Sequence, residues 1–276
     1  SVASSSQVNV ANAAGTFDIS GVTAGTSVTT LNGVAGSNVT LGSKSLGISN
    51  GSTTYAGIIG GAGGALTVGA GTQTLSGVNT YTGATTIGNG TLALSGSGSI
   101  ASSSQVNLAS GGSTFDISTT TAGATVKTLN GVAGSTVALG NKTLTLSNGS
   151  TTFAGNFTSG IGGITLNGGT QTLSGANISY FGSTTINGGT LALSGSGSIA
   201  SSSQVNVIGG TFDISATTAG SSITTLFGSP GSNVTLGNQT LTISNGSTTY
   251  AGIVGGAGGG LNLTSGTQTL AGANTF

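Results

Sequence analysis

Three aspartates are the only acidic side chains of the chain, and acid–base or metal chemistry would have to use them. Asp18, Asp116 and Asp213 each stand in the sequence FDI, 98 and then 97 residues apart. Glycoside hydrolysis needs two carboxyl groups within roughly 5 to 10 Å of each other. A calcium site usually needs more than one carboxylate among its oxygen ligands. Isolated aspartates therefore favour a solvated surface position or a turn over a catalytic or metal site.

The sequence also lacks the residues that activate a nucleophile and the helix that follows a nucleotide-binding loop. The chain is rich in serine but has no histidine, and no lysine or second acid stands at a suitable spacing to activate a serine. GSGSIA at Gly96 and at Gly195 has the glycine spacing of a dinucleotide loop. It is followed by SSSQVN, which alternates like a strand, whereas a dinucleotide loop opens a helix. We predict no enzymatic activity, no cofactor and no metal site.

The composition argues against several partners. Lys44, Lys127 and Lys142 are the only cations, and the net charge is zero. Such a chain cannot neutralise the phosphates of a nucleic acid or an anionic lipid surface. It has no cysteine for a disulfide or a thiolate metal site. Since it has neither a run of eighteen apolar residues nor a basic and apolar leader, we expect no membrane insertion of this segment and no signal peptide.

The framework for any site is a long internal repeat. TLALSGSGSIASSSQVN occurs at 91–107 and again at 190–206, and a variant of its second half opens the chain. Gln7, Gln105 and Gln204 mark the same position in three copies. We predict a single β-solenoid over residues 1–276, with copies at 1–98, 99–197 and 198–276, the last of them partial. Because both ends fall inside a repeat, we expect a longer natural polypeptide.

Short alternating segments predict the fold. QVNV, FDIS, NVTL and TLALS recur about every ten residues between clusters of Gly, Asn and Ser, which is typical of short strands with one apolar face. Repetition at several scales favours a solenoid over a sandwich or a propeller. We predict an all-β fold, a right-handed parallel β-helix with about 20 residues per coil. About five coils per long repeat would separate successive aspartates by about 24 Å, which excludes paired acid catalysis.

Length differences between the copies predict where the chain turns. VIGGTF, which contains Phe212, is two residues shorter than VANAAGTF, which contains Phe17. Such changes are tolerated in turns rather than in paired strands. NISYFGSTT from Asn177 is one residue longer than the matching NTYTGATT of the preceding copy. A bulge would absorb that residue, and Tyr180 or Phe181 would then change face.

One segment resembles a known family. GTQTLSGVNTYTGATTIGNGTLALSG, residues 71–96, is similar to the autotransporter passenger-associated β-strand repeat of Gram-negative surface proteins. Residues 169–195 resemble it again but read ISYF where a Thr-Tyr-Thr run is usual, and a third copy starts at Gly266. The resemblance implies a β-helical passenger stem exported through a C-terminal outer-membrane barrel. The family repeat has no catalytic residue and is associated with passenger secretion and folding.

Outward hydroxyl groups are the remaining candidates for binding. The pair Thr72 and Thr74 recurs at 170 and 172 and at 267 and 269, and such pairs on many successive coils would form a plane able to bind ice or sugar. One recurrence per long repeat does not make that plane. The tyrosines at 81, 180 and 250 are too sparse for a sugar-stacking track.

These observations lead to two functional hypotheses. The first is a structural β-helical stalk or fibre segment, extracellular or on the bacterial cell surface, that supports adhesion or the formation of a matrix or filament. The alternative is a glycan- or cell-binding module that uses its Thr, Ser and Asn face. We expect two kinds of partner: further copies of the chain, joined end to end or side by side, and host or bacterial surface glycans.

Overall fold

The computed structural model describes residues 7–158, 160–176 and 179–276, and in these residues the regular structure is β-strand throughout. No helix in this part of the chain is long and apolar enough to cross a membrane. The chain divides into two compact units, unit 1 (residues 1–138) and unit 2 (residues 139–276). The boundary between the units falls inside the predicted second copy, 99–197.

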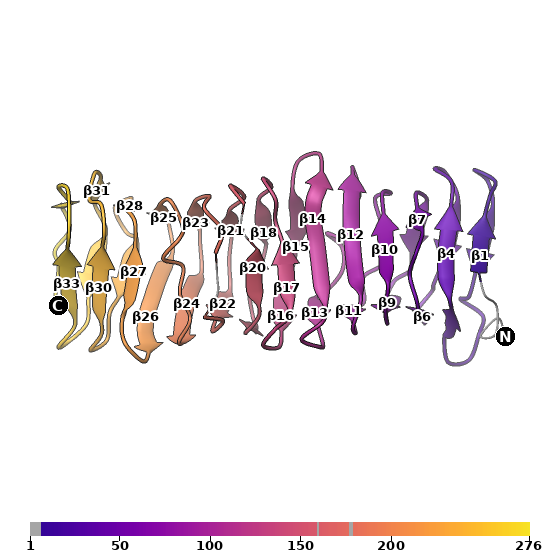
Figure 1. Ribbon diagram of the computed structural model, residues 1–276, viewed down its shortest axis with the longest axis horizontal. Coiled ribbons are helices and arrows are strands. Elements are labelled where there is room, and N and C mark those ends of the chain that lie inside the picture. Colours follow the sequence, from indigo (N-terminus) through magenta and orange to yellow (C-terminus); the bar gives the residue numbers. More distant parts are fainter. Residues whose placement is uncertain (1–6, 159, 177–178) are drawn as a thin grey trace. The chain divides into compact units, whose positions relative to one another are not determined.

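Unit 1 is a parallel β-solenoid. Its strands stack in rows, which Figure 1 shows as arrows side by side, and we name the rows face A, face B and face C. Face A holds β1 (Gln7–Val10), β4 (Thr30–Gly33), β7 (Thr54–Tyr55), β10 (Thr72–Leu75), β12 (Thr91–Gly96), β14 (Thr114–Thr120) and β17 (Thr136–Ala138). Face B holds β2 (Thr16–Asp18), β5 (Asn38–Thr40) and β8 (Ile58–Gly60). Face C holds β3 (Thr26–Val28), β6 (Ser45–Ile48), β9 (Ala65–Val68), β11 (Thr85–Ile87), β13 (Val106–Leu108) and β16 (Leu129–Gly131), and the unit also contains β15 (Ala124–Val126).

Unit 2 repeats the same architecture, with faces D, E and F. Face D holds β19 (Thr152–Phe153), β22 (Thr170–Leu173), β24 (Thr190–Gly195), β26 (Thr211–Thr217), β29 (Asn233–Thr235) and β32 (Ile253–Gly255). Face E holds β18 (Leu144–Leu146), β21 (Ile164–Leu166), β23 (Thr184–Ile186), β25 (Val205–Val207), β28 (Leu226–Gly228), β31 (Thr249–Tyr250) and β34 (Thr269–Leu270). Face F holds β27 (Ser221–Ile223), β30 (Thr240–Ile243) and β33 (Gly260–Leu263), and β20 (Asn156–Thr158) also lies in this unit.

The predicted parallel β-solenoid and its coil length are confirmed. Paired residues on neighbouring turns are 19 residues apart between Leu66 and Thr85 and 23 apart between Val106 and Leu129. Along most strands, buried aliphatic side chains alternate with more exposed residues, as in β9, where Leu66 and Val68 are fully buried. Stacking turn on turn pairs the backbone groups of each inner strand on both sides, as a buried backbone requires.

The long repeat spans fewer turns than the predicted five. In unit 1, β1 pairs Val8 with Leu31 on face A, and the equivalent pair of the next copy, Val106 with Leu129, lies on face C. From β1 to β12 the chain makes four complete turns of face A, and it then passes two faces further to reach β13. The repeat therefore advances by four and two-thirds turns.

In unit 2 the long repeat also advances by four and two-thirds turns. Gln171 lies in β22 on face D, and its equivalent in the next copy, Gln268, directly precedes β34 on face E. The strands β22, β24, β26, β29 and β32 mark four turns of face D, and β33 on face F then comes before β34. Equivalent residues of successive copies thus lie on different faces of the solenoid.

The turn predicted before Phe212 is confirmed. The short connection lies between the end of β25 and the start of β26, and the longer connections before Phe17 and Phe115 lie between β1 and β2 and between β13 and β14. Of the two aromatic residues in ISYF, Tyr180 is fully buried and Phe181 is 54% exposed, so Phe181 is the one that faces outward. Asn177 and Ile178 lie outside the described residues.

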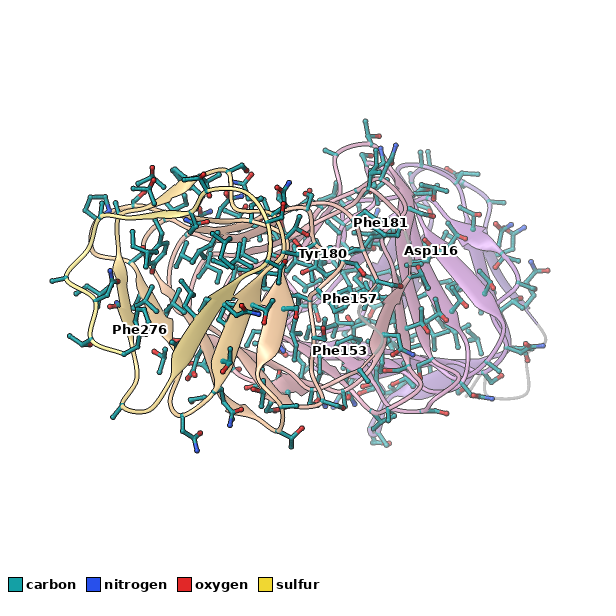
Figure 2. The ribbon with its side chains drawn as sticks, turned by 60° about the vertical axis from the view of Figure 1, so that its left-hand side comes forward. Asp116, Phe153, Phe157, Tyr180, Phe181 and Phe276 are labelled. Carbon is teal, nitrogen blue, oxygen red and sulfur yellow. The ribbon has the colours of Figure 1, made fainter. Side chains whose placement is uncertain are left out.

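Three buried aromatic side chains of unit 2 pack against one another. Phe153 and Phe157 have ring centroids 5.0 Å apart, and Tyr180 lies 5.7 Å from Phe157, both in edge-to-face geometry. Figure 2 shows these three rings pointing toward one another inside the solenoid. Such pairs contribute about 1 kcal/mol each beyond the apolar area that they bury.

Candidate functional site: a buried polar clamp

A glutamine occupies an inward position of β10 where aliphatic residues are the rule. Gln73 is fully buried, and its Nε2 donates hydrogen bonds to Leu31 O at 3.0 Å, Thr53 O at 3.0 Å and Thr74 O at 3.1 Å. These carbonyl groups belong to three successive turns of face A. One side chain therefore ties three turns together. Its Oε1 is buried without a hydrogen-bond partner, which costs part of that gain.

Asn79 makes a second tie across three turns. It is 2% exposed, its Oδ1 accepts a hydrogen bond from Ile59 N at 2.9 Å, and its Nδ2 donates to Gly77 O and to Ser99 O, both at 3.0 Å. Ile59 lies one turn before Asn79, and Ser99 one turn after it. The amide thus replaces strand pairing at a corner where the backbone alone would leave polar groups unpaired.

Three hydroxyl groups form a buried chain next to this corner. The Tyr81 hydroxyl lies 2.6 Å from Thr85 Oγ1, which lies 2.9 Å from Ser103 Oγ on the following turn. Ser103 Oγ in turn donates to Gly83 O at 2.9 Å and to Gln105 O at 3.1 Å. Because this chain is enclosed, burial raises the pKa of Tyr81 far above its usual value, and the hydrogen bond with Thr85 offsets that rise only in part.

We call the set Gln73, Asn79, Tyr81, Thr85 and Ser103 the polar clamp. Buried hydroxyl and amide groups stabilise a fold when their hydrogen bonds are made and are costly when they are not. Within the clamp, nearly every buried polar atom has a partner on a neighbouring turn. The arrangement binds turn to turn and positions no group for attack on a substrate.

The clamp recurs in the second copy of the segment. Tyr180 and Thr184 have their hydroxyl oxygens 2.6 Å apart, and Ser202 Oγ follows at 2.9 Å from Thr184 Oγ1. Gln171 is fully buried and donates to Thr151 O at 2.9 Å. The residue equivalent to Asn79 falls at Asn177, outside the described residues. Tyr180 keeps the inward place of Tyr81 in spite of the added residue before it.

The third copy keeps the amide part of the clamp. Gln268 Nε2 donates to Leu226 O at 2.9 Å and to Thr248 O at 3.0 Å, which lie two turns and one turn earlier. Asn274 Oδ1 accepts a hydrogen bond from Val254 N at 2.8 Å. Gln268 therefore makes on face E the bonds to two preceding turns that Gln73 makes on face A, and Asn274 repeats the bond of Asn79 Oδ1 to the preceding turn.

Two glycines of the segment lie where a side chain has no room. A Cβ added to Gly77 would lie 1.9 Å from Gly57 O on the preceding turn, far inside contact distance. Gly71 has a φ of 65° as well as a similar close approach to Gly51 O. Backbones that meet this closely, and a positive φ, both require glycine. The glycines of the segment are thus part of how the turns stack around the clamp.

The three aspartates have turn-forming contacts. Asp18 Oδ1 accepts a hydrogen bond from Ser20 N at 2.8 Å, and Asp116 and Asp213 bind the serine two residues on in the same way at 2.8 Å. Hydrogen bonds from Ser20 lower the pKa of Asp18. In unit 1, Asp18 is on face B and Asp116 on face A, four and two-thirds turns further on, which is about 22 Å along the axis. They do not form a carboxylate pair, and the described residues contain no cluster of three metal-ligating side chains.

The GSGSIA segments lie at strand ends. Gly96 ends β12 and Gly195 ends β24, with φ of 57° and 58°, and each segment leads on to another strand of the solenoid. The chain after them offers no helix N-terminus to a pyrophosphate. These glycines therefore lie where the chain leaves a strand and turns.

The outward threonines form a single column on face A. Thr72 pairs with Thr91, Thr91 with Thr114 and Thr114 with Thr136, so a threonine recurs on each of four successive turns. This is more regular than the sequence suggested. The neighbouring column contains Thr54 and Thr74 but continues with Ala93, Asp116 and Ala138, so two parallel rows of threonine do not form along the same four turns.

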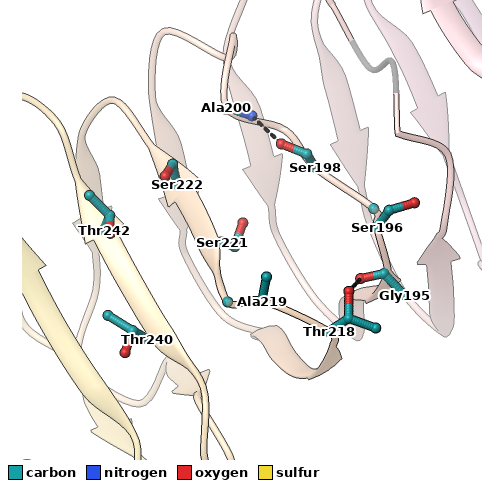
Figure 3. A pocket seen from close by; sticks show the side chains of 12 residues that line it. Gly195, Ser196, Ser198, Ala200, Thr218, Ala219, Ser221, Ser222, Thr240 and Thr242 are labelled. Carbon is teal, nitrogen blue, oxygen red and sulfur yellow. Dashed lines mark hydrogen bonds between the residues drawn. The ribbon is translucent and has the colours of Figure 1, made fainter.

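Unit 2 has a shallow groove lined by hydroxyl groups, shown in Figure 3. Its volume is about 390 Å³, and the loop after β24 forms one side, with β27 and β30 forming the other. Thr218 Oγ1 donates to Gly195 O at 3.1 Å, and Ser198 Oγ accepts from Ala200 N at 3.3 Å. The hydroxyl-bearing residues of the lining are Ser196, Ser198, Thr218, Ser221, Ser222, Thr240 and Thr242.

The polar clamp was not predicted from the sequence, although a signal for it was present. In TQTL the alternation places Thr72 and Thr74 outward and Gln73 inward, so a glutamine stands at an inward position of the pattern in all three copies, fully buried in the first two. A polar residue at such a position needs buried partners. The tyrosine contacts were less accessible, because the partner serine is contributed by the next turn.

Comparison with known families points to the same segment. The family model of the passenger-associated-transport-repeat matches residues 67–94 and 166–193, about a fifth of the chain. No curated protein and no solved structure matches the chain. The first match contains the clamp residues Gln73 to Thr85, and the second contains Gln171 to Thr184. The predicted resemblance is confirmed: the chain is a β-solenoid that carries two passenger-associated transport repeats.

Proposed function

We propose that this chain is a structural segment of a secreted bacterial surface protein, a β-solenoid stem in which each passenger-associated transport repeat binds adjacent turns together. The observation that carries the proposal is the polar clamp, since the matched segments place their distinctive Gln, Tyr and Thr residues inside the solenoid. A residue set used for recognition or catalysis would face solvent or a cleft. Here it faces neighbouring turns.

The proposed role explains why the repeat serves passenger folding. A solenoid gains stability from contacts between neighbouring turns, so each turn must order against the one before it. Gln73 and Asn79 each contact three turns, which makes ordering of one turn depend on the next. We propose that the segment has no enzymatic activity of its own and that its extracellular role in adhesion, matrix or filament formation depends on a stable β-solenoid support.

Removal of one turn in register tests this role. Because Thr72 pairs with Thr91, deletion of residues 72–90 joins β12 to the preceding chain with the face A register kept and removes four clamp residues. Because Val106 pairs with Leu129, deletion of 106–128 removes one turn without a clamp residue and is the matched control. Both variants would be secreted from a Gram-negative host as passengers, and their protease-resistant fraction at the cell surface measured. We expect a larger loss for the first deletion, and equal losses would contradict the proposal.

The hydroxyl-lined groove of unit 2 supports a second function, binding of neutral surface glycans. Its lining carries hydroxyl donors and acceptors without charge, which suits an uncharged polyol rather than an anion. A glycan array with the purified chain tests it, with Ser222→Ala and Thr242→Ala combined as the variant. Signals that the variant loses would support the groove, and an array without signal, or one that the variant leaves unchanged, would count against it.

A further inference from the structure

The same outward residues occur on two faces of unit 1. Asn9 pairs with Asn32 on face A, and Asn32 Nδ2 donates a hydrogen bond to Asn9 Oδ1 at 3.1 Å. On face C, Asn107 pairs with Asn130, and Asn130 Nδ2 donates to Asn107 Oδ1 at 2.8 Å. A glutamine lies two residues before the first asparagine of each pair. We name these sets amide patch A (Gln7, Asn9, Asn32) and amide patch C (Gln105, Asn107, Asn130).

The two patches face different directions because of the length of the repeat. A whole number of turns would place both on one face, whereas the advance of four and two-thirds turns places patch C two faces beyond patch A. Each patch retains hydrogen-bonding capacity, because an amide has two donor hydrogens and two acceptor lone pairs and the bond between the asparagines uses one of each. All six side chains are exposed or half-exposed.

Small polar residues extend each patch along the solenoid. On face C, Asn107 pairs with Thr86 and Thr86 with Thr67, which carries the column two turns further. On face A, Thr54 and Thr74 pair on the turns that follow Asn32. Each column repeats at the spacing of parallel strands, about 4.8 Å. A partner with the same spacing can repeat one contact on every turn, and a second copy of this chain has that spacing.

The charge of the chain also favours a second copy as the partner. Three lysines and three aspartates give a net charge of zero over 276 residues. Proteins near zero net charge lack the long-range repulsion that keeps equal molecules apart. We propose that copies of this chain associate side by side through amide patches A and C, so that each copy contacts neighbours in two directions. This inference rests on the proposed stem function.

Two self-complementary patches have a specific consequence for assembly. Contact between equal patches is two-fold symmetric and closes a pair, so a chain with one patch would stop at dimers. With a second patch on another face, each member of the pair is still able to bind a further copy. Association then continues laterally into sheets or bundles of solenoids.

Lysine substitutions separate the two patches. Asn32→Lys blocks patch A and Asn130→Lys blocks patch C, since two copies of the same patch would then bring like charges together. The matched control combines Ala35→Lys with Ala133→Lys, which adds charge at exposed corners two or more residues beyond the patches. Sedimentation velocity over a concentration series gives the mass of the assemblies, negative-stain electron microscopy gives their width, and far-UV circular dichroism monitors the fold.

We expect the unsubstituted chain to form assemblies larger than dimers, each single variant to stop at dimers, and the double variant Asn32→Lys with Asn130→Lys to remain a single chain. The corner control should assemble like the unsubstituted chain. If either lysine changes the circular dichroism spectrum, Asn32→Ala and Asn130→Ala test the same order of assembly.

Three outcomes would overturn the inference: an unsubstituted chain that stays single at every concentration, a single-patch variant that abolishes all association or leaves it unchanged, and a corner control that loses assembly. None of them touches the stem function, because a solenoid that stays single but keeps its β spectrum and its dependence on the clamp still supports that role.

Discussion

Replacement of Gln73 by methionine tests whether the polar clamp stabilises the solenoid. Methionine keeps the length and approximate volume of the side chain but removes the amide. Nε2 has two hydrogens, which three carbonyl oxygens share, so the loss of these hydrogen bonds costs about 2 kcal/mol in total. The buried Oε1 without a partner disappears as well, which returns about 1 kcal/mol. The hydrogen bonds outweigh the orphan oxygen, and we expect a net loss of about 1 kcal/mol.

Gln73→Ala adds a cavity to the same loss. Truncation of a buried side chain of this size costs about 2 to 3 kcal/mol more, for an expected total of about 3 to 4 kcal/mol. The control is Thr72→Ala, one residue away in the same strand but exposed, for which we expect a change within about 0.5 kcal/mol.

The assay combines urea unfolding followed by far-UV circular dichroism with hydrogen exchange of the Thr74 amide. That amide donates to Thr53 O, one of the carbonyl groups the clamp binds. If the free energy of local opening falls by about 1.4 kcal/mol, this amide exchanges about tenfold faster. The reasoning is refuted if Gln73→Met is as stable as the unsubstituted chain or more stable, since the unpaired oxygen would then cost as much as the three hydrogen bonds provide.

Further predictions concern the hydroxyl chain, the glycines and the response to pH. Thr85→Val keeps the shape of a residue that joins two buried hydroxyl groups and should cost about 1 to 3 kcal/mol in urea unfolding, whereas outward Thr86→Val should change stability by less than about 0.5 kcal/mol. Gly77→Ala places a Cβ 1.9 Å from a carbonyl oxygen and should lower the free energy of unfolding by about 3 kcal/mol or more. Gly21→Ala, with nothing within 4 Å of the added Cβ, should leave the free energy of unfolding nearly unchanged in the same assay. Burial raises the pKa of Tyr81 in the folded state, so the contribution of its protonated hydroxyl to stability is complete below the unfolded pKa of about 10 and is lost as the pH rises further. The melting temperature should therefore fall above about pH 10, and Tyr81→Phe should make that fall smaller.

The fold was accessible from the sequence because every level of the pattern agrees. Alternation in segments such as ALTV at β9 predicts a strand with one buried face, and the spacing of such segments predicts the turn length. Turn residues and the absence of helix-forming stretches point the same way, and this consistency between local and global signals is typical of a well-specified fold.

The number of turns per repeat was harder to predict because it depends on small differences. A turn of 19 residues and a turn of 23 residues both fit the same alternating pattern, and the connection between β13 and β14 is longer than the one between β25 and β26. The sum of such differences decides whether a copy ends on the face where it began. Only the register of each pair of strands resolves this, and the sequence does not specify it turn by turn.

Equivalent residues of successive copies lie on different faces, so the interior hydrogen bonds of the solenoid can be compared with the direction in which its surface patches point. In unit 2, Gln171 on face D and Gln268 beside face E both donate to a carbonyl group of the preceding turn, because each turn interacts with its neighbouring turns and not with a fixed direction in space. Rotation by two-thirds of a turn is therefore neutral for the interior. On the outside the rotation changes which way a patch points, as with Asn32 and Asn130. The length of the repeat thus keeps the hydrogen bonds of the interior and determines in how many directions the surface is presented.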